Sequence, residues 1–448
     1  MAFELRIADE RCRAAVERIR ERVAAAGGRA LLVGGCVRDA LLGRPVRDVD
    51  VEVFGLESEA LAELLAHDFG GRRVGTSFPV FVLDQLPIDV ALPLEPGLDF
   101  AQAAARRDFS LNALGWDPAS RELLDPHGGR ADLLAHRLRH TSEHFADDPL
   151  RVLRGMQLCA RFELDPAPET TALCRRLSPA GLPAERIFGE WRKLLLQGRR
   201  ISQGLAFLRA CDWLRHFPEL AALPGCPQDP EWHPEGDVWV HTLHCLDAFA
   251  DARSGDERED LLVGLAVLCH DLGKPATSVR EPDGRITSRG HEKLGAELTQ
   301  RFLARITRES LLRDEVPRLV AAHLAPVQLY QSRAGDAAIR RLARRVGSIE
   351  RLLRVASADH AGRPPLPGRP FEAGDWLRAR ARALAVADSA PEPLLRGRHL
   401  LALGLEPGPE IGRILDVCFE AQLAGRITTL DDALALAKRI SGGRTPAA

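Results

Sequence analysis

Apolar and polar residues alternate strictly from Asp48 to Val53, the pattern of a strand with one buried face. Short apolar runs bounded by Gly or Pro predict further strands, and a tight turn separates the last two of them. The predicted strands are residues 29–33, 47–55, 79–84 and 87–92. Residues 9–26 have the spacing of an amphipathic helix. From about residue 146 strand patterns almost disappear and helical spacing prevails, which predicts an α+β head and an all-helical remainder.

Composition narrows the class of protein. The chain has 448 residues, of which 45% are apolar and 28% are charged, as in ordinary folded proteins. No apolar run approaches the roughly 20 residues that a membrane-spanning helix needs. The N-terminal segment carries charges where a signal peptide has its apolar core, and the nine cysteines include no CxxC pair. We therefore expect a cytoplasmic protein with reduced thiols and no membrane contact.

Charge is balanced overall but not locally. The chain has 61 basic and 63 acidic residues, which excludes a globally cationic nucleic-acid binder. Residues 171–210 hold eight basic and two acidic side chains, and residues 339–354 hold six and one. Either segment could be a solvated helix face, but the two together favour contact with an RNA backbone. The candidate RNA-binding residues are Arg192, Lys193, Arg199 and Arg200.

Carboxylates on the alternating strand are the first candidate for chemistry. Asp48 and Asp50 are two residues apart, so both side chains point to the same face. That spacing suits two Mg²⁺ ions for displacement at a phosphate, and Asp89 on the next predicted strand could supply a third catalytic carboxylate. Taken alone, such a pair of carboxylates is equally compatible with an exposed strand edge.

A glycine turn precedes these carboxylates. Gly34 and Gly35 open a predicted helix, whose free N–H groups favour a bound triphosphate, and Arg38 lies in the first turn of that helix.

Histidines in the helical part form a second candidate site. They follow the order H…HD…H…H…D, and imidazole with carboxylate suits a divalent metal that generates hydroxide near neutral pH. His270 and Asp271 are consecutive, so they can share a metal only at an irregular helix end, which Gly273 and Pro275 provide. The predicted ligands of this metal are His241, His270, Asp271 and Asp359. His291 and His323 are open to either reading, as further ligands or as residues on the substrate side.

Five motifs in order resemble the tRNA nucleotidyltransferase and poly(A) polymerase family, within the polymerase-β-like nucleotidyltransferases. The bacterial class of CCA-adding enzymes is the most similar. The motifs are GGCVRDALLGRPVRDVDVEV (34–53), RRDFSLNAL (106–114), DPHGGRADLLAHRLRH (125–140), DDPLRVLRGMQLCARF (147–162) and AERIFGEWRKLL (184–195). The resemblance implies a polymerase-β-like head with an all-helical neck, and transfer of nucleotides from CTP and ATP to a tRNA 3′ end without a template. No protein partner is implied.

The same resemblance assigns nucleotide contacts. It implies that Arg107 and Asp108 contact the sugar and phosphates of the incoming nucleotide. We expect Asp148 and Arg151 to share one face of a helix, where together they can imitate the Watson–Crick edge of a base. In the family this pair selects CTP and then ATP, and Arg154 one turn further on is expected to hold phosphate or base.

The histidine series resembles the HD phosphohydrolase domain found in one subgroup of CCA-adding enzymes. Such domains can act as phosphatases or 2′,3′-cyclic phosphodiesterases, with a divalent metal that the sequence does not identify. A degenerate HD fold kept for packing is the alternative. The expected parts are a nucleotidyltransferase head (1–145), a nucleotide- and RNA-binding neck (146–223), an HD domain (230–375) and a helical tail (376–448).

One departure from the family bears on the product. The segment between Asp89 and Arg106 is short and lacks arginine, whereas CCA-adding relatives carry a longer flexible loop there, associated with the switch from C to A addition. We therefore expect efficient addition of two cytidines and poor addition of the terminal A. The alternatives are a poly(A) polymerase, or a metal phosphohydrolase whose head only binds RNA.

Overall fold

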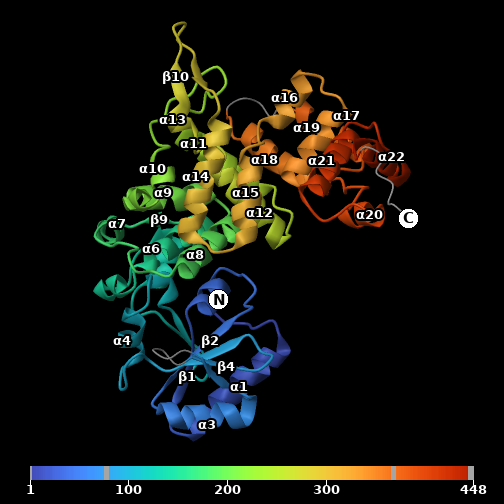
Figure 1. The fold of residues 1–448 in the computed structure, drawn as a ribbon. Helices are drawn as coiled ribbons and strands as arrows, with labels where there is room; N and C mark the ends of the chain where they lie inside the picture. The colour runs from blue at the N-terminus through green and yellow to red at the C-terminus, as the bar shows by residue number, and fades with distance from the viewer. Residues whose placement is uncertain (1–2, 75–79, 365–369, 442–448) are drawn as a thin grey trace. The chain divides into compact units, whose positions relative to one another are not determined.

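The computed structural model describes residues 3–74, 80–364 and 370–441 (Figure 1). The chain divides into two compact units. One comprises Met1–Glu190 with Gln203–His216, and the other comprises Trp191–Ser202 with Phe217–Ala448. The first unit therefore unites the predicted head with much of the predicted neck.

A seven-stranded sheet forms the centre of the first unit, in the order β3-β4-β5-β2-β1-β6-β7. Its strands are β1 (Arg29–Val33), β2 (Val49–Phe54), β3 (Arg72–Val74), β4 (Val80–Val82), β5 (Ile88–Ala91), β6 (Gly115–Asp117) and β7 (Glu122–Leu124). Among these described strands β2 and β5 alone are parallel neighbours, and the other pairs are antiparallel. A parallel pair needs a crossover, which here contains α3 (Ser58–Phe69), β3 and β4.

The two faces of this sheet differ in polarity. Helices α1 (Glu10–Ala25) and α3 lie along one face (Figure 1). Val49, Val51 and Val53 of β2 share a hydrophobic core with the buried residues of these helices. Because successive side chains of a strand point to opposite faces, Asp50 and Glu52 lie on the other face.

The structure confirms the predicted elements of the head. The helix expected at 9–26 is α1, and the strands expected at 29–33, 47–55, 79–84 and 87–92 are β1, β2, β4 and β5. Residue 79, where one of these predicted strands begins, lies outside the described residues. The strands β3 (RRV), β6 (GWD) and β7 (ELL) were not predicted, because three residues are too few to show an alternation and, unlike β4, these strands do not lie in an apolar run.

Short helices and strands complete the first unit, and α8 and α9 contribute residues to both units. They are α2 (Gly35–Leu41), α4 (Phe100–Ala105), η1 (Ser110–Asn112), α5 (Gly129–Leu134), β8 (Arg137–Leu138), η2 (Glu143–Asp147), α6 (Leu150–Phe162), β9 (Asp165–Pro166), α7 (Pro168–Arg175), α8 (Ala184–Gln197), α9 (Ile201–Ala210) and η3 (Trp213–His216).

The second unit is built around α12 (Glu257–Cys269), which is buried on every side from Asp260 to Cys269. Four helices pack directly against it: α11 (Val238–Asp251), α14 (His291–Ile306), α15 (Ser310–Val320) and α18 (Ile349–Ala361). The other elements are α10 (Pro218–Ala221), α13 (Lys274–Thr277), β10 (Ser278–Arg280), β11 (Ile286–Ser288), α16 (Ala325–Gln331), α17 (Asp336–Val346), α19 (Glu372–Ala383), α20 (Gly397–Ala402), α21 (Pro409–Leu423) and α22 (Leu430–Ile440).

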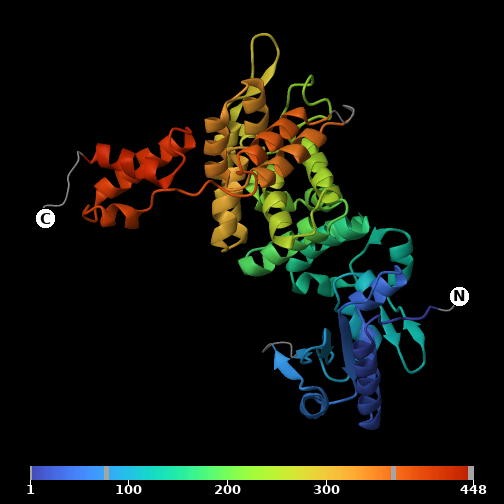
Figure 2. The same cartoon turned by 90° about the vertical axis from the view of Figure 1, so that its right-hand side faces the viewer.

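Two features of this unit were not expected. The strands β10 and β11 form a hairpin that stands out from the helices in both ribbon views (Figures 1 and 2), although no strand was predicted there. The helix α19 packs against α16 and α18, so the expected boundary between 375 and 376 falls inside a helix.

Helices α20 to α22, red in Figure 2, share a separate small core. Within the described residues, no helix is both long and apolar enough to cross a bilayer.

Candidate functional site

Three carboxylates meet on the open face of the head sheet. Because β2 and β5 run in parallel, Asp50 and Asp89 are direct partners in register. Asp48 lies immediately before β2, two residues from Asp50 and exposed on the same side. Burial and the neighbouring Asp89 and Asp48 raise the pKa of Asp50, and burial with Asp48 raises the pKa of Asp89. Oxygen donors whose charge is only partly compensated by the protein fit a hard divalent cation.

The turn at Gly34 brings the backbone and an arginine to these carboxylates. Gly34 has a φ of 74°, and a Cβ there would lie 2.9 Å from Arg107 Nη1 and 3.7 Å from Asp50 Oδ2. Gly35 begins α2 beside them, as predicted. Arg107 Nη2 donates to Glu52 Oε2 at 3.0 Å, while its buried Nε has no hydrogen-bond partner among the described residues. Glu52 therefore holds Arg107 beside Asp50, and Glu52, which the sequence analysis missed, continues the alternation that places Asp48 and Asp50.

Arg38 was expected near a triphosphate, but its donors are directed into the protein. The guanidinium is buried, donates to Asn112 Oδ1 at 2.5 Å and to Asp39 Oδ1, and stacks on Phe162 at 4.4 Å. Asn112 in turn donates to Asp108 Oδ1 at 2.9 Å. Arg38 therefore orients Asn112 and, through it, Asp108.

Asp108 is the centre of a buried polar network. It accepts from the backbone N–H of Phe109 at 2.7 Å and from Arg154 Nη1 at 3.0 Å, in addition to Asn112. Burial alone would raise the pKa of Asp108, but Arg154 and these hydrogen bonds hold it below its ordinary value. Arg154 is therefore held in a fixed orientation by its hydrogen bond to Asp108.

Asp148 does not lie in the helix where it was expected, whereas Arg151 does. Asp148 precedes Pro149 and has φ −135° and ψ 100°, and α6 begins only at Leu150. The residue before a proline is driven out of the helical region, so Asp148 cannot belong to the helix. Its Oδ2 instead accepts from Arg186 Nη2 at 2.7 Å, and its Oδ1 accepts from the N–H of Leu150. Arg186, on α8, was missed because nothing local links it to Asp148.

Arg151 is held by carbonyl groups on both of its terminal nitrogens. Nη1 donates to His144 O at 2.6 Å and Nη2 donates to Arg106 O at 2.7 Å. The Arg106 carbonyl ends the short segment after Asp89, which folds as α4 with a capping box between Asp99 and Gln102. Arg106 also pairs with Glu95 at 2.5 Å. The short segment and Arg151 are therefore connected directly.

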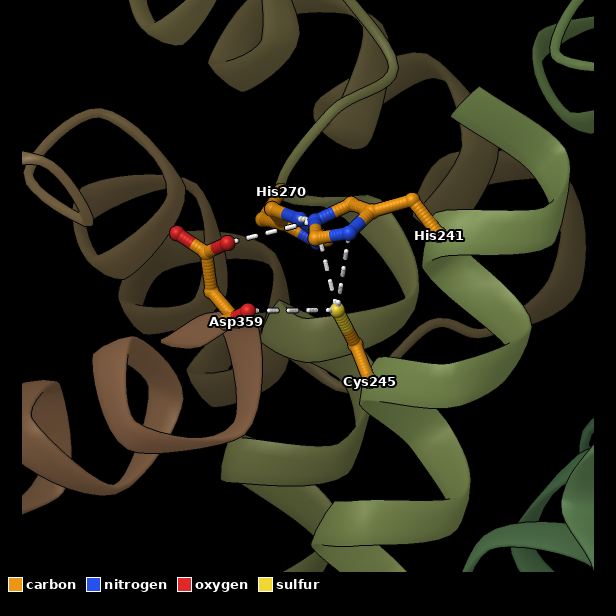
Figure 3. A group of neighbouring side chains, drawn as sticks. All are labelled: His241, Cys245, His270 and Asp359. Atoms are coloured by element: carbon orange, nitrogen blue, oxygen red, sulfur yellow. Dashed lines mark hydrogen bonds and ion pairs between the residues drawn. The ribbon is translucent and has the colours of Figure 1, made fainter. Parts of the chain in front are cut away.

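The second unit gathers four donors from α11, α18 and the residue after α12. His241 and Cys245 lie one turn apart on α11, His270 follows α12, and Asp359 lies near the end of α18 (Figure 3). His241 Nε2 lies 3.3 Å from His270 Nε2, 3.2 Å from Asp359 Oδ1 and 3.3 Å from Cys245 Sγ. The sequence analysis missed Cys245, although its position four residues after His241 was visible. These donors fit a divalent metal.

Surrounding groups fix the orientation of His241. Its Nδ1–H donates to Glu235 Oε1 at 2.7 Å, and His233 Nδ1 donates to the same oxygen at 2.9 Å. Burial would raise the pKa of Glu235, but these two hydrogen bonds lower it to about 2. A carboxylate behind a histidine is the arrangement that directs the other ring nitrogen to a metal. Glu235 and His233 lie in the proline-rich segment 224–236 before α11, and the sequence analysis singled out neither of them.

Asp271 lies beside this group, with His291 and His323 on its other side. Asp271 is buried, and neither carboxylate oxygen has a hydrogen-bond partner among the described residues, although Lys274 Nζ lies 2.8 Å from Oδ2. Burial and the nearby His270 lower the pKa of His323 to about 4. At neutral pH His323 is therefore an uncharged imidazole, the form that binds metals.

Two of the four predicted RNA-binding residues, Arg192 and Arg200, lie in surface ion pairs. Arg192 pairs with Glu257 at 2.6 Å and Arg200 lies 3.8 Å from Asp251, all with largely exposed side chains. In the 339–354 segment Arg351 pairs with Glu259 and Glu315, and Arg354 pairs with Asp260. Arg341 and Arg344 both reach Glu420. Four of the six arginines of this segment are therefore in ion pairs within the protein, and its contact with RNA stays a prediction.

Known proteins share the two domains that carry these sites. Residues 30–83 and 94–139 match the poly A polymerase head domain, and residues 238–389 match the HD domain. The multifunctional CCA protein of Halorhodospira halophila is 35% identical over 413 residues, which cover 85% of this chain and 92% of that protein. The chain belongs to the multifunctional CCA protein family. The relative from Methylococcus capsulatus is also 35% identical, over 416 residues covering 86% of this chain and 92% of that protein.

Solved structures agree on the fold. A CCA-adding enzyme in complex with CTP has a TM-score of 0.62 at 18% identity, covering 98% of this chain and 97% of that one. The Thermotoga maritima CCA-adding enzyme complexed with tRNA has a TM-score of 0.59 at 18% identity, covering 97% and 96%. Membership in the multifunctional CCA family and the α+β fold with a nucleotidyltransferase head and an HD domain are thus confirmed.

The buried network predicts a specific loss of stability. Asp108→Asn removes the charge that compensates Arg154, and should lower the free energy of unfolding by about 1.5–3 kcal/mol at pH 7. Because the pKa of Asp108 is depressed below its ordinary value of 3.8, this contribution is lost only as the pH falls below about 4, so the two proteins should become more alike toward about pH 2. Urea denaturation at both pH values measures the difference.

Asp148→Asn is the matched control, because its partner Arg186 is largely exposed and the change should cost less than about 1 kcal/mol. Equal effects of the two substitutions would contradict a special role for the Asp108 network.

Proposed function

We propose that this chain extends tRNA 3′ ends by transferring cytidylate from CTP, and that the carboxylates of β2 and β5 carry the reaction. The supporting observation is the register of Asp50 with Asp89, on the face where Asp48, Gly34 and Arg107 also converge. This arrangement serves phosphoryl transfer from a nucleoside triphosphate, which an RNA-binding head without catalysis would not need. We place the reaction in the cytoplasm, with CTP, ATP and tRNA as its partners.

The residues of the head divide the work. Asp48, Asp50 and Asp89 would hold divalent ions, which we take to be Mg²⁺ because all three ligands are carboxylate oxygens. Such ions, when bound, supply charge stabilisation to the attacking hydroxyl and to the leaving pyrophosphate. Arg107, whose guanidinium lies beside Gly34 and Asp50, would contact a phosphate, and Asp108 holds Arg154 in place for sugar or base. The 3′ oxygen of the RNA forms a bond to the α-phosphorus as the bond to pyrophosphate breaks.

Selection of the nucleotide falls to Asp148, Arg151 and Arg186. Asp148 accepts hydrogen bonds and the two arginines donate them, so the set can match one edge of a base without a nucleic-acid template. Asp148 is held by Arg186 on α8, and Arg151 is held by the carbonyl of Arg106. Recognition of adenine after cytosine requires these donors and acceptors to change orientation, because the two bases present different hydrogen-bonding edges.

The short segment after Asp89 restrains the orientation of Arg151. Its helix α4 is closed by a capping box, and Arg106 is tied both to Glu95 and, through its carbonyl, to Arg151. A segment held in this way cannot carry Arg151 into a second arrangement without breaking these contacts. We therefore assign the addition of two cytidines as the main product.

A second activity is favoured by the HD domain. The donors at His241, His270, Asp271 and Asp359 adjoin a cavity of about 820 Å³, whose lining includes the cations Lys274 and Arg363. These cations suit the phosphate of an ester such as a 2′,3′-cyclic nucleotide. Water would bond to phosphorus while the ester P–O bond breaks, and the leaving oxygen would take up a proton. A divalent ion at these donors, when bound, supplies the Lewis acidity for this hydrolysis.

The two activities should be separable by single substitutions. Asp50→Asn should lower cytidylate transfer by more than about 100-fold, since even an outer partner of a metal ligand costs 10–100-fold. It should leave hydrolysis of a 2′,3′-cyclic nucleotide unchanged. Asp271→Asn should have the converse effect, so each variant is the control for the other. If Asp50→Asn transferred cytidylate at the wild-type rate, the head would not be the catalyst that we propose.

The product can be identified at the RNA end. Incubation of a tRNA lacking CCA with CTP and ATP together should yield ends that terminate mainly in CC, because Arg151 is held in one arrangement. Sequencing of the 3′ ends measures this distribution. A majority of complete CCA ends would refute the argument from the short segment, and long A tails would indicate a poly(A) polymerase.

A further inference from the structure

Two exposed aromatic side chains lie in the wall of the HD cavity. Trp232 is 62% exposed and Tyr330 is 38% exposed, and both line this cavity of about 820 Å³. Aromatic residues make up only 5% of the chain, and within the described part of the chain every other Phe or Trp side chain is buried or half-buried. Exposed apolar surface that gathers in one cavity is typical of a site that holds a ligand.

The backbone that carries Trp232 is held on both sides. The N–H of Trp232 donates to the carbonyl of Asp229 at 3.1 Å, and Asp229 Oδ2 accepts from the N–H of Ile286 in β11 at 3.1 Å. The next residue, His233, donates through Nδ1 to Glu235 Oε1 at 2.9 Å, within the hydrogen-bonded group behind the metal donors. The backbone at Trp232 is therefore fixed relative to those donors.

The ring of Tyr330 is also held in place. Its hydroxyl donates to Glu372 Oε2 at 3.2 Å. Its ring meets Trp376 in a T-shaped contact, with the two centroids 5.8 Å apart. Tyr330 therefore presents an oriented aromatic surface to the cavity, and ordering it on binding costs little entropy.

Helix α16 separates this ring from the metal donors. Leu324 follows His323 directly, and Leu324, Val327 and Tyr330 recur at intervals of three residues and all line the cavity. Because an α-helix rises 1.5 Å per residue, Tyr330 lies about 9 Å along the helix from Leu324. This distance leaves room for a sugar between a phosphate at the donors and a ring at Tyr330.

A stacked pair of rings extends the aromatic lining toward the donors. His360 and Phe371 stack with centroids 5.0 Å apart and planes inclined by 24°, and both line the cavity. His360 directly follows the metal donor Asp359 on α18, and Phe371 directly precedes α19. A Cβ at Gly374 would overlap the ring of Phe371, so glycine permits this placement. The cavity thus combines flat apolar surfaces with donors for a phosphate ester.

We propose that Trp232 and Tyr330 form a base-binding subsite, so that the HD domain selects nucleotides over phosphate esters that lack a base. This inference rests on the hydrolysis proposed above for the HD domain, and it assigns the part of the substrate that the metal donors do not contact. Every nucleobase has a π face, so stacking holds a base without recognition of its edge. Purines are favoured over pyrimidines, because they offer the larger face.

Hydrolysis of two matched cyclic esters by the full-length protein tests the subsite. 2′,3′-cyclic AMP carries a base, whereas glycerol 1,2-cyclic phosphate has the same five-membered ester ring without one. Tyr330→Leu and Trp232→Leu keep apolar bulk but remove an aromatic face, so each should raise the KM for 2′,3′-cyclic AMP by about 5- to 150-fold. Neither substitution should change kcat for this ester or the hydrolysis of the glycerol ester, because neither ring contacts the reacting phosphate.

Two substitutions serve as controls. Tyr330→Phe keeps the ring and removes only the hydroxyl that binds Glu372, so it should retain the wild-type KM for 2′,3′-cyclic AMP. Val279→Ala shortens an exposed apolar side chain of the same unit that does not line the cavity, and should have no effect.

The outcomes separate this proposal from the one on which it rests. If both leucine variants kept the wild-type KM, or if 2′,3′-cyclic CMP had a lower KM than 2′,3′-cyclic AMP, the stacking subsite would be overturned and the hydrolase would stand. If the wild type hydrolysed neither ester, the hydrolytic role would be overturned. Equilibrium dialysis of 2′,3′-cyclic AMP then still decides on the subsite, since both leucine variants should bind it more weakly than the wild type, and equal binding would contradict the proposal.

Discussion

The parallel pairing of β2 with β5 places Asp50 directly beside Asp89, and the rest of the head is arranged around the charge that this creates. Burial raises the pKa of both carboxylates, and repulsion adds to it, from Asp89 and Asp48 at Asp50 and from Asp48 at Asp89. This register is maintained because Val49, Val51 and Val53 on the opposite face pack in a hydrophobic core with α1 and α3, which offsets the repulsion. Arg107 then approaches over Gly34, where a side chain would block it.

The HD domain also holds buried carboxylates close together, but on a helical scaffold instead of a sheet. Asp271 and Asp359 are held among histidines at the ends of α12 and α18, on a scaffold whose central helix is buried on every side. Each inward-facing ring is fixed through its other nitrogen, His241 by Glu235 and His270 by the carbonyl of Val267. These ring orientations are therefore fixed before a cation binds, so that little reorganisation is needed when it does.

Much of this was accessible from the sequence, and the failures have physical reasons. Alternation over Asp48–Val53 predicted the strand and the shared face of its carboxylates. The glycine turn predicted the start of α2, and the order of the histidines predicted the group of metal donors in the HD domain. Asp148 was placed on a helix although Pro149 already excluded it. Arg186 and Glu235 contribute through contacts between distant segments, which no local periodicity reveals. Cys245 was visible as the residue one helical turn after His241, but a lone cysteine gave no reason to single it out.

The most direct test of the central claim is transfer of a single labelled nucleotide. The full-length protein would be incubated with a tRNA transcript that ends before the CCA sequence and with labelled CTP alone, in Mg²⁺ or in excess chelator. If the carboxylates beside Gly34 catalyse nucleotidyl transfer, label should enter the RNA in Mg²⁺ and not in chelator. Absence of label in Mg²⁺, or equal incorporation in chelator, would contradict the account.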